Sequence, residues 1–277
     1  MKPKSVDIKE AVKMSFSMAY AIYMRMQSNN SRRVVLYYHS ITKDQIKGFR
    51  KQMGYLAKAY KVVKTSEIMK AQQDDAKGVI AITIDDAFSN VYENALPVLR
   101  EFGLSAAVFA PVGNLGCKPH WEIEGSNEDS EMAIMSYQQL IDMDKEGFEI
   151  FSHTFSHPKL TEIDQKKLNV EIAGSKRILE RLLGHEVTAI SYPYGVHDDS
   201  VCKAAKKAGY DHGFTIEPIM VDDSTDQFRI GRFAVSAEDS LVKFKLKCNG
   251  AFHASMALSA IKAFTLMKAL IIRALKI

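Results

Sequence analysis

Short apolar runs alternate along this chain with longer amphipathic stretches, and this alternation constrains the fold more than any other feature. A continuous apolar run of about four to eight residues is typical of a strand that is buried on both faces, and helical stretches between such runs are typical of βαβ units. The sequence therefore predicts an α/β fold with a parallel sheet. The expected strands are Val34–Tyr38, Tyr60–Val63, Val79–Ile84, Ala106–Ala110, Phe148–Phe151, Thr188–Tyr192, Gly213–Ile216 and Ile230–Val235.

The stretches between these runs begin and end at residues that commonly terminate helices. Asp164, and either Asp198 or Asp199, can act as N-caps, because a carboxylate accepts hydrogen bonds from the first amides of a helix. Glycines follow several of the stretches, and glycine is a common C-terminal cap. The expected helices cover residues 44–59, 90–102, 136–146, 164–183 and 198–208.

The length and composition are those of a soluble protein with one barrel-sized domain. Of the 277 residues, 47% are hydrophobic and 25% are charged, which is ordinary for a globular chain. Charge is unevenly distributed, because residues 240–277 contain lysine and arginine but no acid. We therefore expect a helical extension over residues 1–33, a catalytic α/β domain over 34–240 and a basic amphipathic tail over 241–277.

Several features favour a cytoplasmic location. Charged residues, among them Asp7, Lys9 and Lys13, interrupt any apolar segment that could form an export signal. The three cysteines are too few and too irregularly spaced for a disulfide framework or a metal site, which is typical of a reducing compartment. No run reaches the ~20 uninterrupted apolar residues of a spanning helix.

Polar side chains gather just beyond the carboxyl ends of the expected strands. In a parallel α/β fold these ends share one edge of the sheet, and ligands bind there. Their shared position indicates a single functional site. The residues are His39, Asp85, Asp86, His153, His157 and Tyr194.

The strongest signal in this set is the dipeptide Asp85-Asp86, which directly follows the apolar run Val79–Ile84. Adjacent carboxylates repel each other, so a folded protein seldom places them together unless a cation shares the site. Successive side chains that leave a strand point in different directions, so one acid can bind a metal while the other acts as a general base on water. The alternative is a pair of acids at the N-terminus of the helix 90–102, where they suit the helix dipole.

His153 and His157 supply imidazoles that can complete a metal site. Pro158 disfavours helical geometry at His157, so we expect both histidines in a loop at the end of a strand. One carboxylate and two imidazoles leave a position open for water, which is the composition of hydrolytic zinc sites, although other divalent transition metals also suit these ligands. The alternative is two ordinary surface histidines.

Three segments resemble, in order and spacing, motifs of the polysaccharide deacetylase family (the chitooligosaccharide deacetylase homology domain). They are Thr83–Phe88, Ser152–Pro158 and Ser191–Gly195, and the similarity extends from about Val34 to about Val235. The resemblance implies a distorted (β/α)7-type barrel, flanked here by N- and C-terminal amphipathic helices. It also implies metal-dependent hydrolysis of an acetyl group from a sugar.

The same resemblance assigns roles to individual residues. Asp85 corresponds to the catalytic base, and the backbone amide of Tyr194 corresponds to a donor that stabilises the oxyanion. The residues that correspond to the metal ligands are Asp86, His153 and His157.

The chain departs from the family pattern at three places. Ala87 stands where the first motif usually has glycine, and Ser191 stands where the third motif usually begins with an arginine that orients the base. The late Leu-x-His motif, which supplies the catalytic acid in many members, is missing from the C-terminal third.

Two other residues are candidates to replace what is missing. A circularly permuted subgroup, which deacetylates poly-N-acetylglucosamine, carries the acid histidine on its first strand, and His39 matches that position. We expect His39 to be the catalytic acid; the alternative is a polar residue that caps the loop at Ser40. Arg232, on the last expected strand, is a candidate to pair with Asp85 in place of the missing arginine, and we group it with the substrate-binding residues.

Two further segments suggest contacts outside the metal site. The irregular loop 112–135 contains Trp121, the only tryptophan, which could stack on a sugar; the alternative is a hydrophobic plug that fixes the loop. Residues 254–277 combine broad apolar coverage with basic side chains, which suits a helix lying on an anionic membrane surface; the alternative is a helix packed on the barrel. We expect no nucleic acid partner, because no groove-reading motif accompanies the charge.

Together these features predict a metal-dependent deacetylase with Zn²⁺ as the default ion. Its expected substrate is an acetylated, most simply N-acetylated, sugar of a cell-surface glycan or of a lipid- or nucleotide-linked precursor. We expect the enzyme in the cytoplasm, peripherally bound to the inner face of the membrane. Two alternatives stay open: a hydrolase of a non-sugar C–N amide on the same fold, and a catalytically silent carbohydrate-binding module.

Overall fold

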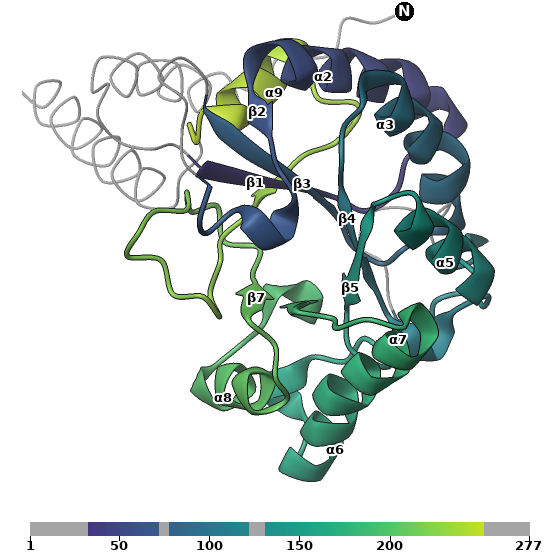
Figure 1. Ribbon diagram of the computed structural model, residues 1–277, viewed down its shortest axis with the longest axis vertical. Helices are drawn as coiled ribbons and strands as arrows, with labels where there is room; N and C mark the ends of the chain where they lie inside the picture. Colours follow the sequence, from purple (N-terminus) through teal and green to yellow (C-terminus); the bar gives the residue numbers. More distant parts are fainter. Residues whose placement is uncertain (1–32, 72–77, 122–130, 252–277) are drawn as a thin grey trace, which may run out of the picture.

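The computed structural model describes residues 33–71, 78–121 and 131–251, and its centre is one curled parallel sheet (Figure 1). The spatial order is β7-β6-β5-β4-β3-β1-β8, and β2 pairs in parallel with the start of β3. The strands are β1 (Arg33–Tyr38), β2 (Lys61–Val62), β3 (Val79–Ile84), β4 (Ala107–Ala110), β5 (Glu149–Ser152), β6 (Ala189–Ser191), β7 (His212–Phe214) and β8 (Phe233–Ala234).

Strands β1 and β3 are neighbours in the interior of the sheet, and both are buried along their whole length. They pair in parallel from end to end, and the last pair joins Tyr38 to Ile84. The backbone amide of Asp85 then donates a 2.8 Å hydrogen bond to the carbonyl of Tyr38. This register brings the residues that follow the two strands, His39 and Asp85, to the same edge of the sheet.

Helices lie in an arc around the outside of the curved sheet (Figure 1). Asp164 and Asp198 cap two of them by accepting hydrogen bonds from backbone amides, as their positions in the sequence predict. Two π-helical turns, η3 (Val91–Ala95) and η6 (Val170–Gly174), interrupt the expected helices 90–102 and 164–183. The α-helices are α2 (Ile46–Ala59), α3 (Leu96–Phe102), α5 (Tyr137–Lys145), α6 (Gln165–Asn169), α7 (Ser175–Leu183), α8 (Asp199–Lys207) and α9 (Leu241–Cys248).

The curled sheet and its helices form a half-barrel, which confirms the expected distorted α/β barrel. The largest difference is at the last strand, which is shorter than the expected run Ile230–Val235. Ile230 forms an isolated parallel bridge with Phe214 at the end of β7, and the amide of Arg232 donates to the carbonyl of Glu217. The backbone on either side of Arg232 is therefore held by two different neighbours, and regular pairing with β1 begins only at Phe233.

The folded body continues beyond residue 240, where we expected the tail to begin. Helix α9 packs against α2 through the buried side chain of Phe244, whose ring lies 6.3 Å from that of Tyr55. Lys243 and Lys247 both form ion pairs with Asp239, so part of the positive charge of this segment is neutralised within the fold.

Most of the predicted N-terminal extension and the predicted amphipathic segment 254–277 lie outside the described residues. Within the described part of the chain, none of the helices has the length and apolar character needed to cross a bilayer.

Candidate active site

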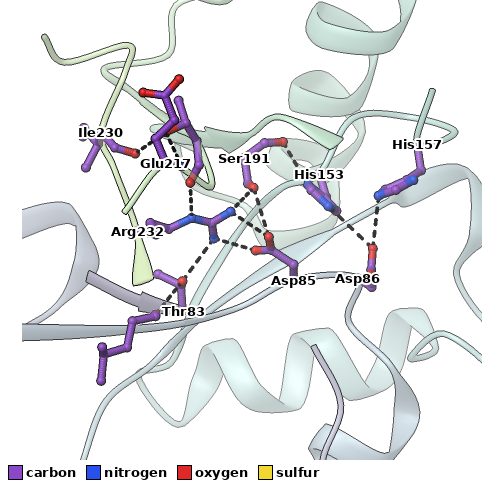
Figure 2. Close-up of polar contacts among 11 residues, drawn as sticks. Thr83, Asp85, Asp86, His153, His157, Ser191, Glu217, Ile230 and Arg232 are labelled. Atoms are coloured by element: carbon purple, nitrogen blue, oxygen red, sulfur yellow. Dashed lines mark hydrogen bonds and ion pairs between the residues drawn. The ribbon is translucent and has the colours of Figure 1, made fainter. Parts of the chain in front are cut away.

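Four of the predicted polar residues meet at the carboxyl edge of the sheet: Asp85, Asp86, His153 and His157 (Figure 2). Asp85 and Asp86 directly follow β3, and His153 directly follows β5. The two acids diverge there: Asp85 points toward Arg232, whereas Asp86 points toward the two histidines (Figure 2). The adjacent carboxylates therefore have separate partners, as expected for two separate roles.

Asp86, His153 and His157 form a compact buried group. The Oδ1 atom of Asp86 lies 3.5 Å from Nε2 of His153 and 3.3 Å from Nε2 of His157. One ligand atom from each residue lies within 4.8 Å of the others, and all three side chains are at most 8% exposed. Two nitrogen atoms and one oxygen atom in this arrangement can bind a divalent transition metal from one side.

The protonation of the histidines also fits a metal. Nδ1 of His153 donates to the backbone carbonyl of Ser191 at 2.9 Å, and this contact orients the ring so that Nε2 faces Asp86. Burial, together with the nearby His153, lowers the pKa of His157 to about 2. His157 therefore offers a lone pair at neutral pH, which is the form that binds metal.

The backbone at this edge adopts left-handed conformations that side chains usually avoid. Asp86 has a φ of 66°, and Ala87 has a φ of 53°. Glycine occupies the Ala87 position in the usual family motif, and glycine adopts this region without steric cost. The alanine adopts this region here, and Asp86 points toward the two histidines.

Asp85 forms a bidentate ion pair with Arg232. Nη1 of Arg232 donates to Oδ1 of Asp85 and Nη2 donates to Oδ2, both at 2.7 Å, and neither side chain is more than 3% exposed. The remaining donors of the guanidinium bind Thr83 Oγ1 at 3.1 Å, Ser191 Oγ at 2.7 Å and the carbonyl of Thr215 at 2.9 Å. All five N–H donors of the arginine are thus occupied.

Aromatic rings complete the enclosure of this arginine. Its guanidinium lies 4.7 Å from the ring centre of Tyr37, 5.4 Å from that of Phe109 and 5.9 Å from that of Phe214, which are cation–π distances. Arg232 is fully buried, so the grouping of Arg232 with the substrate-binding residues is corrected: no donor remains for a substrate. Arg232 instead pairs with Asp85, which is the position expected of a residue that replaces the missing motif arginine.

This environment keeps Asp85 ionised. Burial alone would raise the pKa of the carboxyl, and it is the largest single effect. The charge of Arg232, the charge of His153, the hydrogen bonds from Arg232 and the charge of His39 together outweigh it. The pKa of Asp85 consequently lies below its usual range. A carboxylate that is ionised at neutral pH has the form required of a general base.

Two of the three remaining candidates, Tyr194 and Trp121, have rings beside that of His157. His39 is exposed at the end of β1, with its ring 5.5 Å from that of Tyr37. Tyr194 lies in the turn η7 (Pro193–Gly195) after β6, with a φ of 58°, and its ring is 4.8 Å from that of His157. Trp121 stacks on the same imidazole, that of His157, with ring centres 4.3 Å apart.

Sequence reasoning missed the acceptors that hold Arg232. Thr83 and Thr215 lie at the ends of β3 and β7, and nothing in their local sequence distinguishes them from other strand threonines. Ser191 was noted only as a departure from the family motif, yet its hydroxyl binds both Arg232 and Asp85 while its carbonyl orients His153. A small residue at position 191 leaves room for an arginine that arrives from another strand.

Comparison with known proteins decides the family. The sequence profile of the polysaccharide deacetylase family matches residues 72–213, about half of the chain. The chain belongs to the polysaccharide deacetylase family. This deacetylase is therefore a carbohydrate-modifying hydrolase, as the sequence predicted. His39 and Arg232 lie outside the matched region, so the family match does not bear on the roles expected of them.

Individual relatives agree with the family. The deacetylase is 28% identical over 211 residues to YxkH of Bacillus subtilis, across 73% of this chain and 71% of that protein. It is 29% identical over 178 residues to the poly-β-1,6-N-acetyl-D-glucosamine N-deacetylase of Staphylococcus epidermidis, across 60% of this chain and 58% of that enzyme. The alignment thus spans less than two thirds of the staphylococcal enzyme.

Solved structures share the fold of the deacetylase. The Streptococcus pyogenes deacetylase PplD superposes with a TM-score of 0.67 at 20% identity, over 79% of this chain and 99% of that one. IcaB from Ammonifex degensii superposes with a TM-score of 0.64 at 19% identity, over 80% and 97% of the two chains.

Proposed function

We propose that this deacetylase removes the N-acetyl group from a sugar of a cell-surface glycan, or from its lipid- or nucleotide-linked precursor, by zinc-assisted hydrolysis. The observation that carries the proposal is the meeting of two groups at one sheet edge: a buried Asp86–His153–His157 cluster, and an Asp85 carboxylate kept ionised by Arg232. The name of the staphylococcal relative, which specifies an N-acetylglucosamine polymer, supports an N-acetylated sugar as the substrate.

The metal would be held by Oδ1 of Asp86 and by the Nε2 atoms of His153 and His157. A divalent ion bound there supplies positive charge that polarises an acetyl carbonyl and increases the acidity of water. The mixed oxygen and nitrogen ligands favour zinc, although this donor set also accepts other first-row divalent ions.

Asp85 accepts the proton of the water molecule that attacks the acetyl carbon. Its pKa lies below the usual range, so Asp85 is a weak base, and it is suited to water whose acidity has already been increased. The paired hydrogen bonds from Arg232 fix the orientation of the carboxylate during the reaction.

The other candidates act on the oxyanion and on the leaving group. The backbone amide of Tyr194 stabilises the negative charge that develops on the carbonyl oxygen, a contribution worth about 3–4 kcal/mol for one such donor. His39 donates a proton to the sugar nitrogen as the C–N bond breaks. The products are acetate and a free amine on the sugar.

Trp121 offers a surface for the sugar itself. Its ring stacks on the imidazole of His157, so it lies directly beside the metal cluster. An aromatic face next to the reacting acetyl group can pack against the apolar face of a pyranose ring, and this contact would orient the acetamide toward Asp85.

Acetate release coupled to metal analysis tests the proposal. We expect the purified full chain to contain or take up one zinc ion and to release acetate from N-acetylglucosamine oligomers. Chelation should abolish this release, and added Zn²⁺ should restore it. Acetate release from non-sugar amides alone would transfer the chemistry to another substrate class, and zinc binding without acetate release from any acetylated compound would contradict the enzymatic proposal.

We further propose that the enzyme works on the cytoplasmic side, at the inner face of the membrane. Support comes from the sequence of residues 254–277, which contains basic side chains and no acid and would be attracted to anionic lipid. Lys243 and Lys247 are not part of this argument, because both pair with Asp239. A truncation that lacks residues 254–277 should lose its association with membranes in cell fractionation. Unchanged membrane association of the truncated protein would contradict this part of the proposal.

A further inference from the structure

A second buried carboxylate supports the loop that carries the two histidines. Glu171 is 2% exposed, and one of its oxygen atoms accepts hydrogen bonds from the backbone amides of Phe155 and Ser156, at 3.0 and 2.8 Å. Its other oxygen accepts a 2.6 Å hydrogen bond from the hydroxyl of Ser156. Both donor residues lie between His153 and His157, and Glu171 itself lies outside the metal cluster.

This loop has a conformation that needs external support. Thr154 has a φ of 69° and His157 has a φ of 61°, both in the left-handed region. Such conformations are sterically unfavourable for residues other than glycine. The hydroxyl of Thr154 accepts a hydrogen bond from the amide of His157, which stabilises the loop locally at one end. In the middle of the loop, the amides of Phe155 and Ser156 both donate to Glu171, while the carbonyl of Phe155 accepts a 2.7 Å hydrogen bond from the amide of Gly113.

The position of Glu171 depends on a π-helical turn. The turn η6 inserts an extra residue between α6 and α7, and such turns are rare and often occur at functional sites. In the same turn, the carbonyl of Ile172 accepts hydrogen bonds from Ser175 and Tyr210, and Ser175 in turn accepts one from Ser152. The turn is thereby attached to the end of β5, where the metal-binding loop begins.

We propose that Glu171 is a positioning residue that holds the loop between His153 and His157 in its metal-binding conformation. This inference rests on the proposed metal site. The inference predicts an effect on metal affinity. Without Glu171, part of the binding free energy of the metal would be used to order the strained loop, so the metal would bind more weakly. Residues that orient metal ligands typically contribute about 10- to 100-fold to metal affinity or activity.

The chain contains a matched control for this experiment. Glu149, the first residue of β5, accepts hydrogen bonds from the amides of Thr65 and Ser66 and from the hydroxyl of Ser66. The donors are of the same kinds as at Glu171, two consecutive amides and a serine hydroxyl, although at Glu149 the two amides bind different oxygen atoms. The Glu149 contacts lie at the start of β5, whereas the metal-binding loop follows its end. Substitution of Glu149 therefore removes equivalent hydrogen bonds without touching the metal-binding loop.

The experiment compares Zn²⁺ affinity among full-length variants by competition with a chromophoric chelator. We expect Glu171→Ala to weaken zinc binding by about tenfold or more, and Glu171→Gln, which keeps one acceptor oxygen, to have an intermediate effect. Glu149→Gln should bind zinc as tightly as the wild type. The melting temperature of the metal-free proteins measures the purely structural cost of each substitution, and we expect it to fall in both Gln variants.

The outcomes separate this inference from the proposed reaction. Wild-type zinc affinity in Glu171→Gln and Glu171→Ala would overturn the positioning role, and so would an equal loss of affinity in Glu149→Gln. If Glu171→Ala does not fold, the comparison of the two Gln variants decides the question. Zinc affinity that depends on Glu171 in a protein that releases no acetate would contradict the proposed reaction while leaving the positioning role intact. A wild-type protein that binds no divalent ion would overturn both.

Discussion

Arg232 donates two parallel hydrogen bonds of 2.7 Å to Asp85, although the two residues are 147 positions apart in the chain. The pair is almost fully buried, so neither charge can be compensated by water if its partner is removed. Breaking a buried pair by removing one partner typically costs about 3–5 kcal/mol, because an uncompensated charge is left behind. The stability of the protein and the ionisation of Asp85, its candidate base, therefore depend on the same contact.

Removal of the arginine should expose this dependence. We expect Arg232→Met to lower the free energy of unfolding by about 3–5 kcal/mol, measured by urea denaturation. The double variant Arg232→Met with Asp85→Asn should recover part of this loss, because it leaves no unpaired buried charge. Strictly additive effects of the two substitutions would show that the ion pair is not energetically coupled.

Substitution of the base alone should separate metal binding from turnover. Asp85→Asn keeps the size of the side chain but cannot accept a proton, so we expect acetate release to fall by about 10²–10⁴-fold. Zinc content should stay at the wild-type level, because Asp85 points away from the metal cluster. Asp86→Asn is the control and should lose zinc. Turnover near the wild-type rate in Asp85→Asn would remove the base assignment.

Trp121 should affect substrate binding more than chemistry. We expect Trp121→Ala to raise KM for an N-acetylglucosamine oligomer by about 5- to 150-fold, which corresponds to about 1–3 kcal/mol for a stacking contact with an aromatic side chain, with a smaller change in kcat. Trp121→Phe retains a ring and should lie between the two. An unchanged KM with a lower melting temperature would instead identify Trp121 as the hydrophobic plug of the loop, the alternative that the sequence left open.

Asp239 should make the docking of α9 sensitive to acid. Burial alone would raise the pKa of Asp239, but the hydrogen bond and the charge of Lys247 lower it below its usual value. A carboxyl with a lowered pKa in the folded state stabilises the protein above its unfolded pKa of about 4, and this stabilisation is lost as the pH falls through the folded value.

Asp239→Asn provides the measurement. We expect this variant to be about 1.5–3 kcal/mol less stable than the wild type at pH 7, the usual contribution of hydrogen bonds to charged groups. The difference in unfolding free energy should shrink as the pH is lowered below 4, since the wild-type carboxyl then becomes protonated as well. A difference that is independent of pH would show that the charge of Asp239 contributes nothing to stability.

The sequence by itself determined the parallel sheet and the residue types of the candidate metal site, Asp86, His153 and His157. Fully apolar runs such as Val79–Ile84 can be buried on both faces only inside a layered α/β fold, so the strands could be located before any coordinates were known. Asp86, His153 and His157 each directly follow or closely follow such a run. Because parallel strands end at one edge, their convergence was predictable.

Only the tertiary structure decided which side chains support that cluster. Arg232 reaches Asp85 from the start of another strand, Ser191 orients His153 through a backbone carbonyl, and Glu171 reaches the loop from a π-helical turn. Sequence patterns report which face of an element is apolar. They carry no information on which distant hydroxyl, carbonyl or carboxylate comes within 3 Å of a given donor, because that depends on how the elements pack.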